Sequence, residues 1–518
     1  MYFQIFFIIL SLAGGVSFYF WVIPAILKKH SIFNKILDAP YPIFERFLPS
    51  PESTYYIAIS VIIALIIWIM LEIIYYTNIE KPLTSRGSAH WASKKDVKDL
   101  IQSKGVPIGR LDGKILRVDK THLVTCAGTR SGKGIGAIIP TLIEYPYSLV
   151  CLDIKGENYA VTGARRKEFG KVFVLNPFEV LDFKSNSYNW LDSIDLNDPG
   201  CTDKALRIAS ILVGGSSDGG TENHFNEQAK RLLQGVILLV CGEKNELRNM
   251  PTVAQLIHKT PFPTLCELMK EKGDLAFGTV GTIGAQFANN TSDKELSGIL
   301  STAQRATNHL DNPQISKTLI ESDFDISKLP DEKMSIYLIM PADKVSDFQD
   351  YIKVFFELAF SSIVSRKKRG KYEVLFLFDE VAQLGYMESF PKLITLVKGL
   401  GAQFWFFFQS IAQLRSIYGK SADTILGNST QIFYGCNDLE TAKLISESLG
   451  KKTIREYKKN GEFSDISKDL LSPDEVRQLK PDTPIIFMAG KPPIKVKRLN
   501  YLNDREFYSK FDKNPYFT

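Results

Sequence analysis

The stretch THLVTCAGTRSGKGIGAIIPTLI, residues 121–143, decides the fold of this chain. Its apolar run at 123–126 predicts a short strand, a glycine-containing turn follows, and a helix is predicted from Lys133. Strand, glycine turn and helix in this order form the context of a phosphate-binding loop. Backbone N–H groups at the start of such a helix bind phosphate oxygens, and glycine permits their close approach. The stretch therefore predicts a P-loop nucleotide site.

The loop itself is AGTRSGKG, residues 127–134. Lys133 supplies a positive charge for the β- and γ-phosphates of a nucleotide. The pattern G-x-x-x-x-G-K-[ST] is broken by Ala127 at its first glycine and by Gly134, where a hydroxyl normally holds Mg²⁺. Thr129, Ser131 or water alone are the alternatives for that missing oxygen. The candidate nucleotide-binding residues are Gly128, Thr129, Arg130, Ser131, Gly132, Lys133 and Gly134.

A second motif, KYEVLFLFDEVAQLG at 371–385, places an apolar run directly before two carboxylates. This is the pattern of a Walker B strand. We expect Asp379 to hold Mg²⁺ through water and Glu380 to orient and deprotonate the attacking water as a general base. The alternative is an ordinary strand that ends in acidic residues, which the P-loop upstream argues against.

A third apolar run, in GAQFWFFFQSIAQL at 401–414, ends at Gln409. A glutamine at a strand end beside the phosphates can hydrogen-bond the γ-phosphate or the attacking water, and so respond to hydrolysis. The alternative for Gln409 is a polar strand terminus without a role. Its position at the end of a third strand favours the sensor role.

Further apolar runs at 148–152, 172–175 and 335–340 alternate with helical patterns. Such alternation indicates a mainly parallel sheet covered on both faces, which is an α/β fold. Ligands of these sheets bind at the carboxyl ends of the strands. Because Lys133, Asp379, Glu380 and Gln409 all follow predicted strands, we expect them to converge at one edge.

Two uncharged or nearly uncharged stretches, at 5–27 and 54–76, predict transmembrane helices. Each is long enough, since about 20 helical residues cross the hydrocarbon core. A cleaved signal peptide is the alternative for the first stretch, although it lacks a positive leading region. Two spans put both termini on one side. The ATPase must face the compartment that holds ATP, so residues 28–53 are predicted to form a short periplasmic loop.

Length and charge restrict the function less than the motifs do. A chain of 518 residues predicts two to four domains, and the whole net charge of +6 lies beyond residue 77. That charge suits an anionic partner, but an ordinary soluble surface explains it equally well. The six cysteines form no C-x-x-C pair, which favours buried thiols over disulfides or zinc.

Several ordered motifs make the chain resemble a known family, the type IV secretion coupling proteins of the TraG kind. The glycine after the lysine of TRSGKG is common in that family. The resemblance extends over about residues 86–518. The other matching stretches are GSAHWA (87–92), IPTL (139–142), LDIKGENY (152–159), FVLNPF (173–178), LSTA (300–303), SDFDISKL (322–329), DEVAQLG (379–385), FFQSIAQL (407–414), LLSPDEVRQL (470–479) and AGKPPIKV (489–496).

This resemblance implies a RecA-like motor domain, residues 81–185 and 325–518, in a hexameric ring at the bacterial inner membrane. It implies an all-helical domain inserted at 186–324 and a membrane anchor at 1–80. The 246 positions from Lys133 to Asp379 (379 − 133) support an insertion. The implied cofactors are ATP and Mg²⁺. The implied partners are single-stranded DNA with a relaxase, effector proteins, and the membrane proteins of the secretion channel.

The family also completes its ATP site with a basic residue from a neighbouring subunit. Lys398, in the stretch before Gln409, is the candidate here. A solvated surface lysine is the alternative, and Arg130 and Arg305 are the other basic candidates. Lysine neutralises transition-state charge without the bidentate fork of arginine.

Three functions follow from these features. The first is a coupling ATPase that delivers relaxase–DNA complexes or effector proteins to a secretion channel, with its ATPase domain in the cytoplasm. The second is a substrate receptor that binds nucleotide only to stabilise its ring and does not act as a motor. The third is a chromosome translocase of the FtsK kind, a family that usually has more spans, a long linker and a winged-helix end.

Overall fold

The computed structural model describes residues 62, 64–73, 84–214, 221–457 and 462–516. The chain separates into two units, Met1–Leu83 and Thr84–Thr518. In the first unit residues 64–73 are helical, and most of their apolar side chains are exposed. The predicted span 5–27 lies outside the described residues, and the span 54–76 lies only partly within them. Among the described residues, no helix combines the length and the hydropathy that crossing a bilayer requires.

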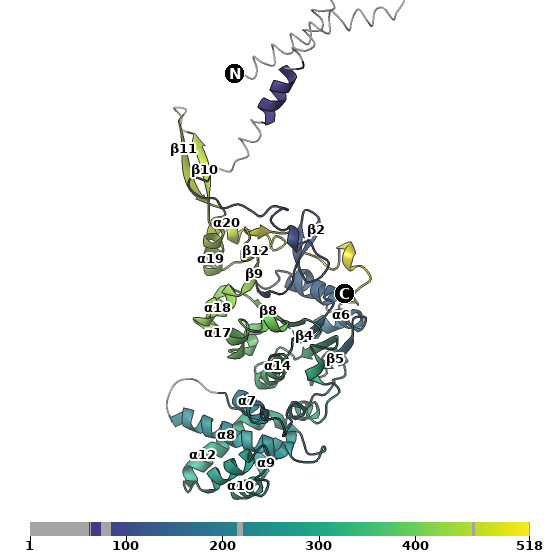
Figure 1. Cartoon of the computed structure of the whole chain (residues 1–518), viewed down its shortest axis with the longest axis vertical. Coiled ribbons are helices and arrows are strands. Elements are labelled where there is room, and N and C mark those ends of the chain that lie inside the picture. Colours follow the sequence, from purple (N-terminus) through teal and green to yellow (C-terminus); the bar gives the residue numbers. More distant parts are fainter. Residues whose placement is uncertain (1–61, 63, 74–83, 215–220, 458–461, 517–518) are drawn as a thin grey trace, which may run out of the picture. The chain divides into compact units, whose positions relative to one another are not determined.

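The second unit is built on a nine-stranded sheet of order β13-β12-β9-β3-β8-β7-β4-β6-β5 (Figure 1). All residues of its five central strands are buried, which is why their sequences are continuous apolar runs. The strands are β3 (His122–Ala127), β4 (Ser148–Asp153), β5 (Lys171–Leu175), β6 (Met334–Ile339), β7 (Val374–Phe378), β8 (Ala402–Phe408), β9 (Ser429–Tyr434), β12 (Ile485–Phe487) and β13 (Ile494–Lys495).

The sheet is parallel from β9 to β5, as the sequence predicts for most of it. β3 lies between β8 and β9, and β7 lies between β8 and β4. β12 and β13 add an antiparallel edge that the sequence did not predict, so the sheet is mixed. Because β3, β7 and β8 run parallel, their carboxyl ends lie on the same side of the sheet.

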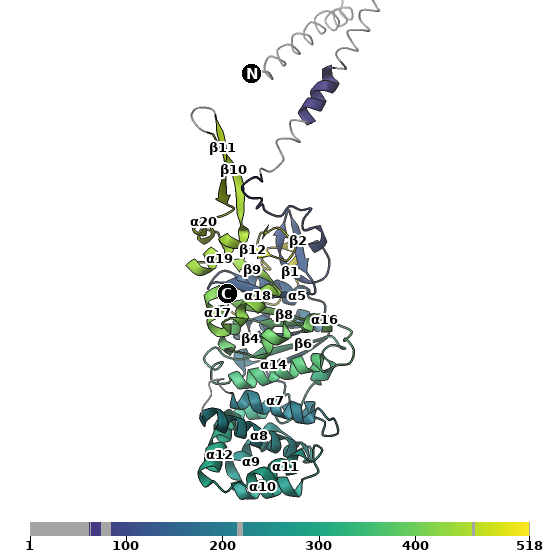
Figure 2. The ribbon, with the colours of Figure 1, turned by 60° about the vertical axis from the view of Figure 1, so that its left-hand side comes forward.

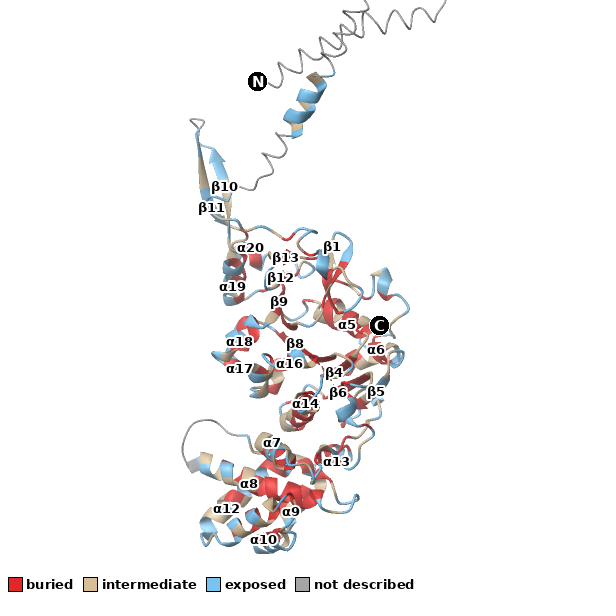
Figure 3. Ribbon diagram, viewed as in Figure 1, coloured by how far each residue is buried: buried red, intermediate tan, exposed pale blue. Residues whose placement is uncertain are grey.

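Both faces of the sheet are covered, and the buried strands appear as the core in Figure 3. Alternate residues of β7 belong to different hydrophobic clusters: Phe376 and Phe378 to one, Leu375 and Leu377 to the other. The first cluster includes α14 (Gln349–Val364), α17 (Ile411–Tyr418), α18 (Ser421–Gly427) and α19 (Leu439–Leu449). The second includes the hairpin of β1 (Val106–Leu111) and β2 (Lys114–Val118), together with α5 (Ile139–Glu144).

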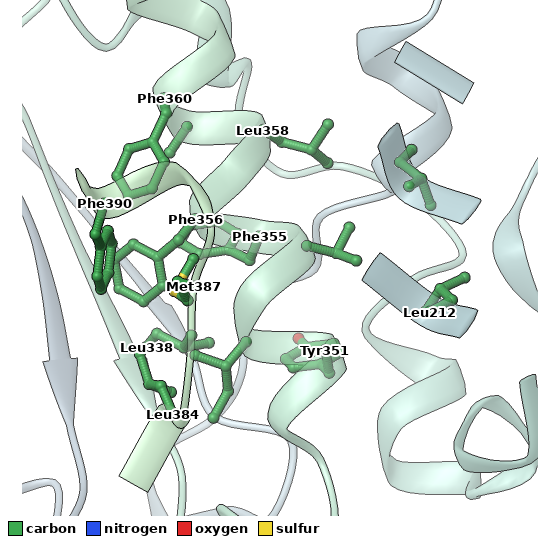
Figure 4. Close-up of a cluster of buried hydrophobic side chains, with 14 of the residues drawn as sticks. Leu212, Leu338, Tyr351, Phe355, Phe356, Leu358, Phe360, Leu384, Met387 and Phe390 are labelled. Atoms are coloured by element: carbon green, nitrogen blue, oxygen red, sulfur yellow. The ribbon is translucent and has the colours of Figure 1, made fainter. Parts of the chain in front are cut away.

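Helix α14 joins the sheet to a helical segment. Figure 2 shows it between the strands and α7, and Figure 4 shows Phe356 and Phe360 on its sheet side and Leu358 on the side toward α7, which carries Leu212. The phenyl rings of Phe356 and Phe378 have centroids 4.6 Å apart. The helix therefore buries apolar side chains on both sides, which explains its mostly buried sequence.

The described residues between β5 and β6 form helices and turns and no strand. Their main helices are α7 (Cys201–Val213), α8 (Thr221–Cys241), α9 (Met250–Lys259), α10 (Phe262–Glu271), α11 (Thr279–Ala288), α12 (Asp293–Thr307) and α13 (Pro313–Lys317). The remaining elements include α6 (Glu157–Lys167), α15 (Ser389–Leu393), α16 (Val397–Leu400), α20 (Pro473–Arg477) and a hairpin of β10 (Lys451–Tyr457) and β11 (Phe463–Asp469). The domain limits at 185 and 325 stay a prediction.

Candidate functional site

The predicted phosphate loop follows β3 as a tight turn. Arg130 and Gly132 adopt φ values of 63° and 84°, in the left-handed region that favours glycine. Ser131 N–H donates to the Gly128 carbonyl at 3.1 Å, and Gly136 N–H donates to the Gly132 carbonyl at 2.9 Å. The helix that follows begins as a π-helical turn, Gly134–Ile138, before α5. The strand, turn and helix thus occur in the predicted order.

Lys133 lies between the two carboxylates that follow β7. Its Nζ is 2.8 Å from Asp379 Oδ1 and 2.9 Å from Glu380 Oε2. Burial by itself would lower the pKa of Lys133, but the adjacent charges of Asp379 and Glu380 raise it above its ordinary value. The ammonium group is therefore charged, and in this conformation it is neutralised by protein carboxylates.

Gln409 joins the same group from the end of β8. Its Nε2 donates to Glu380 Oε1 at 2.7 Å, and its backbone N–H donates to Gln413 Oε1 at 2.8 Å. The structure therefore brings Lys133, Glu380 and Gln409 into direct contact, with Asp379 on the other side of the lysine. Their roles in catalysis stay predictions.

Two observations at the loop fit a polyphosphate with Mg²⁺ as its ligand. A Cβ added at Gly128 or Gly134 would meet no atom within 4 Å, so the backbone there is open to a ligand. The Ser131 hydroxyl is buried and has no hydrogen-bond partner. With the Asp379 carboxylate, it is a candidate oxygen ligand for Mg²⁺, which prefers such ligands. Thr129 is exposed.

Asp153, at the end of β4, is a buried carboxyl beside this group. Its Oδ2 accepts a hydrogen bond from Tyr159 N–H at 2.9 Å. Burial raises the pKa of Asp153 to about 7, and the charge of Asp379 acts in the same direction. The sequence placed Asp153 at a strand end, but no pattern there indicated a role in the site.

Lys398 lies at the amino end of β8, opposite the carboxyl ends of the strands where the phosphate loop lies. It belongs to α16, which precedes β8, whereas Gln409 follows β8. Seven strand residues span about 20 Å, so Lys398 is remote from the loop of its own chain. The side chain is exposed, and its charge acts on His122, at the start of β3. Arg130 is exposed beside the loop, and Arg305 lies on α12.

Arg498 is a contact of the loop that sequence reasoning missed. Its Nη1 donates to the Ser131 carbonyl at 2.6 Å. No local pattern links the two residues, which are 367 positions apart. The only signal was the glycine spacing of the loop, because Gly132 and Gly136 both lie against the Arg498 side chain.

Comparisons with known proteins identify the family of this chain. The family model for type IV secretory system conjugative DNA transfer matches residues 87–518. Protein VirD4 of Rhizobium radiobacter is 28% identical in an alignment 416 residues long, which covers 76% of this chain but only 59% of that relative. Conjugal transfer protein TraG of Escherichia coli is 26% identical over 499 residues, covering 82% of this chain and 78% of TraG.

Solved structures share the fold. The plasmid coupling protein TrwB in complex with ADP and Mg²⁺ superposes with a TM-score of 0.59 at 17% identity, over 79% of this chain and 93% of TrwB. The resemblance stated from the sequence motifs is thereby confirmed. With a family model that matches most of its length, this chain belongs to the type IV secretory system conjugative DNA transfer family, the type IV coupling proteins.

Proposed function

We propose that this chain is an inner-membrane coupling ATPase of a type IV secretion system. Its substrates are relaxase-bound single-stranded DNA, effector proteins, or both, and it delivers them to the secretion channel. The observation that carries the proposal is the direct linkage of Lys133, Glu380 and Gln409 at one sheet edge, with Asp379 beside the lysine. Family membership supports the cargo and the channel as partners.

The proposed organisation has three parts. Residues 1–80 anchor the chain with helices at 5–27 and 54–76, so that the rest lies in the bacterial cytoplasm. Residues 81–185 and 325–518 form the RecA-like motor, and residues 186–324 form the inserted helical domain. Six copies assemble into a ring, in which Lys398 of each copy reaches the site of its neighbour. The exposure of Lys398 and its distance from its own loop support this last role.

Hydrolysis begins with an exchange of partners. The γ-phosphate of ATP competes for Lys133, which leaves its carboxylates and binds phosphate oxygens. Glu380 is then free to accept the proton of the attacking water, and Gln409 orients the Glu380 carboxylate through its hydrogen bond. Mg²⁺, when bound beside Asp379, neutralises charge on the phosphates. TrwB, which shares this fold, has been solved with ADP and Mg²⁺.

The test is ATP hydrolysis by the full-length protein purified in detergent, with and without single-stranded DNA. We expect Lys133→Ala and Glu380→Gln each to lower the rate by about 100-fold or more, the usual contribution of such groups. Lys167→Ala is the matched control, since Lys167 is an exposed lysine of α6. Nucleotide binding without turnover by the wild-type protein would instead identify a nucleotide-stabilised receptor.

DNA as cargo has its own measurement. Binding of single-stranded DNA should weaken with salt, with a slope of about −0.7 per neutralised phosphate. Stimulation of ATP hydrolysis by the same DNA would make the enzyme DNA-dependent. Binding that does not change with salt would exclude a DNA-tracking ring and leave protein effectors as the cargo.

A further inference from the structure

The segment that follows β13 runs along the phosphate loop and is tied down on both sides. Arg498 N–H donates to the Asp482 carbonyl at 2.8 Å, and Lys497 exchanges two backbone hydrogen bonds of 2.8 Å with Arg110 of β1. Tyr501 N–H donates to the carbonyl of Ile135, in the first turn after the loop, at 3.3 Å. Residues 496–501 therefore hold the Arg498 backbone in a fixed place beside the loop.

The Arg498 side chain crosses two glycines of the loop. A Cβ added at Gly132 would lie 1.8 Å from Arg498 Nη1, and one added at Gly136 would lie 2.3 Å from Arg498 Cγ. Both distances are far below van der Waals contact. Besides its left-handed φ, Gly132 therefore has a second reason to be glycine, and Gly136 has this reason even without a left-handed φ.

The hydrogen bond from Arg498 decides which way one loop amide points. The Ser131 carbonyl and the Gly132 N–H belong to the same peptide, and no described peptide bond is cis. In a planar trans peptide the C=O and the N–H point in opposite directions. Because Arg498 holds the Ser131 carbonyl at 2.6 Å on one side of the loop, the Gly132 N–H is directed to the opposite side.

We propose that Arg498 is a positioning residue of the nucleotide site. It holds the Ser131–Gly132 peptide with its N–H turned into the cradle before a nucleoside di- or triphosphate arrives. Without it, the loop must order this peptide on binding, and that cost weakens affinity. The inference rests on the proposed function, because it assigns the ligand of the same loop.

Nucleotide affinity is the first test. In the full-length protein in detergent, Arg498→Ala should raise the Kd for a fluorescent ADP analogue by about 10-fold or more, the scale of a lost charge-assisted hydrogen bond. Its kcat at saturating ATP should stay within about 3-fold, because a binding loop contributes similarly to ground and transition states. Lys497→Ala is the matched control: it removes a neighbouring exposed charge whose side chain does not contact the loop, and it should leave Kd unchanged.

Two further variants keep the test valid if Arg498→Ala folds poorly. Arg498→Lys keeps the charge and one donor, so it should recover part of the lost affinity. Gly136→Ala displaces the arginine instead of removing it, and should also raise Kd. A Cβ at Gly136 would also lie 2.9 Å from the Leu499 carbonyl oxygen, so part of its effect should persist in combination with Arg498→Ala, and the double variant should raise Kd by less than the sum of the two single effects.

Hydrogen exchange of the nucleotide-free protein separates this inference from the proposed function. Arg498→Ala should speed amide exchange in peptides that cover 128–136 and leave those that cover β7 unchanged. A wild-type protein that binds no nucleotide would overturn the proposed function. The exchange result would still show whether Arg498 orders the loop. Unchanged exchange, or a Kd within about 2-fold of the wild type in folded Arg498→Ala, would overturn the inference.

Discussion

At the scale of single residues, the positive charge of Lys133 is already neutralised by protein carboxylates. The side chains of Lys133, Asp379 and Glu380 are 25%, 23% and 19% exposed, so their ion pairs are only partly screened by water. Nucleotide binding must exchange these pairs for contacts with phosphate. The carboxylates therefore lower the net gain from binding, and they also hold the lysine at the place where the phosphate arrives.

This arrangement predicts an effect on stability without nucleotide. Lys133→Ala leaves Asp379 and Glu380 as adjacent, unpaired and partly buried charges, so the free energy of unfolding should fall by about 1–3 kcal/mol. Denaturant unfolding of the detergent-purified protein measures this, with Lys167→Ala as the control. Adding Glu380→Gln to Lys133→Ala should restore part of the loss. Equal stability of Lys133→Ala and wild type would show that the pairs do not form in solution.

The same scale shows which site residues can be found from sequence. Each of the four predicted residues comes soon after an apolar run: Asp379 and Gln409 directly follow β7 and β8, Glu380 follows Asp379, and Lys133 follows β3 after the loop. The carboxyl ends of parallel strands lie on the same side of a sheet, so the sequence alone places these residues together. Arg498 had no such marker. Its partner is 367 residues away, and the contact depends on the sheet edge at β13 that only the folded chain brings close to the loop.

At the scale of elements, strand β3 is held to β8 by the side chain of His122 as well as by the backbone hydrogen bonds of the parallel pair. His122 Nδ1 accepts a hydrogen bond from Phe404 N–H at 3.0 Å, which requires an unprotonated nitrogen. Burial, with the positive charge of Lys398 acting in the same direction, lowers the pKa of His122 to about 4. The folded protein therefore holds this imidazole in its neutral form.

A pH dependence follows with a definite sign. The stability that neutral His122 contributes is complete above its ordinary pKa of 6.5 and is lost as the pH falls through about 4. His122→Gln, which offers an uncharged acceptor, should flatten the fall in unfolding free energy across this window by up to about 3 kcal/mol. Thermal or denaturant unfolding at several pH values measures it. His90→Gln, at an exposed site, should keep the wild-type slope, and an equal slope in His122→Gln would contradict the assignment.

Elements differed in how well their sequence predicted them. The run Val374–Phe378 matches β7 residue for residue, and the runs at 123–126 and 148–152 fall inside β3 and β4. Fully buried central strands are apolar throughout, so they are visible in the sequence. β12 and β13 have three and two residues and lie at the sheet edge, where so short a pattern carries no signal. Their antiparallel pairing depends on neighbours distant in sequence.

At the scale of the whole molecule, the position of Lys398 separates a single chain from an assembly. In one chain it lies at the amino end of β8, and the catalytic candidates lie at the carboxyl end. A ring with head-to-tail interfaces sets unlike surfaces of neighbouring copies against each other. In the proposed ring, Lys398 of one copy would face the nucleotide site of the next copy.

Subunit mixing tests this proposal. Lys398→Ala and Glu380→Gln should each be nearly inactive alone. In a random 1:1 mixture that is allowed to exchange subunits, about a quarter of the interfaces combine an intact site with an intact lysine, so up to about a quarter of the activity should return. Mixing Lys398→Ala with Lys398→Ala/Glu380→Gln is the control without recovery. If full activity remains in Lys398→Ala alone, the lysine is a solvated surface residue.

The placement of β3 between β8 and β9 has a consequence for how the protein is made. Its partner residues in β8 are 282 positions later in the chain, a separation that translation needs roughly 15 to 60 s to cover. During that interval the nascent chain already contains the phosphate loop and every residue before it, but not the strands that flank β3. Arg498, which contacts Ser131 from 367 positions away, leaves the ribosome later still. The phosphate loop can therefore reach its folded form only after most of the chain has been translated.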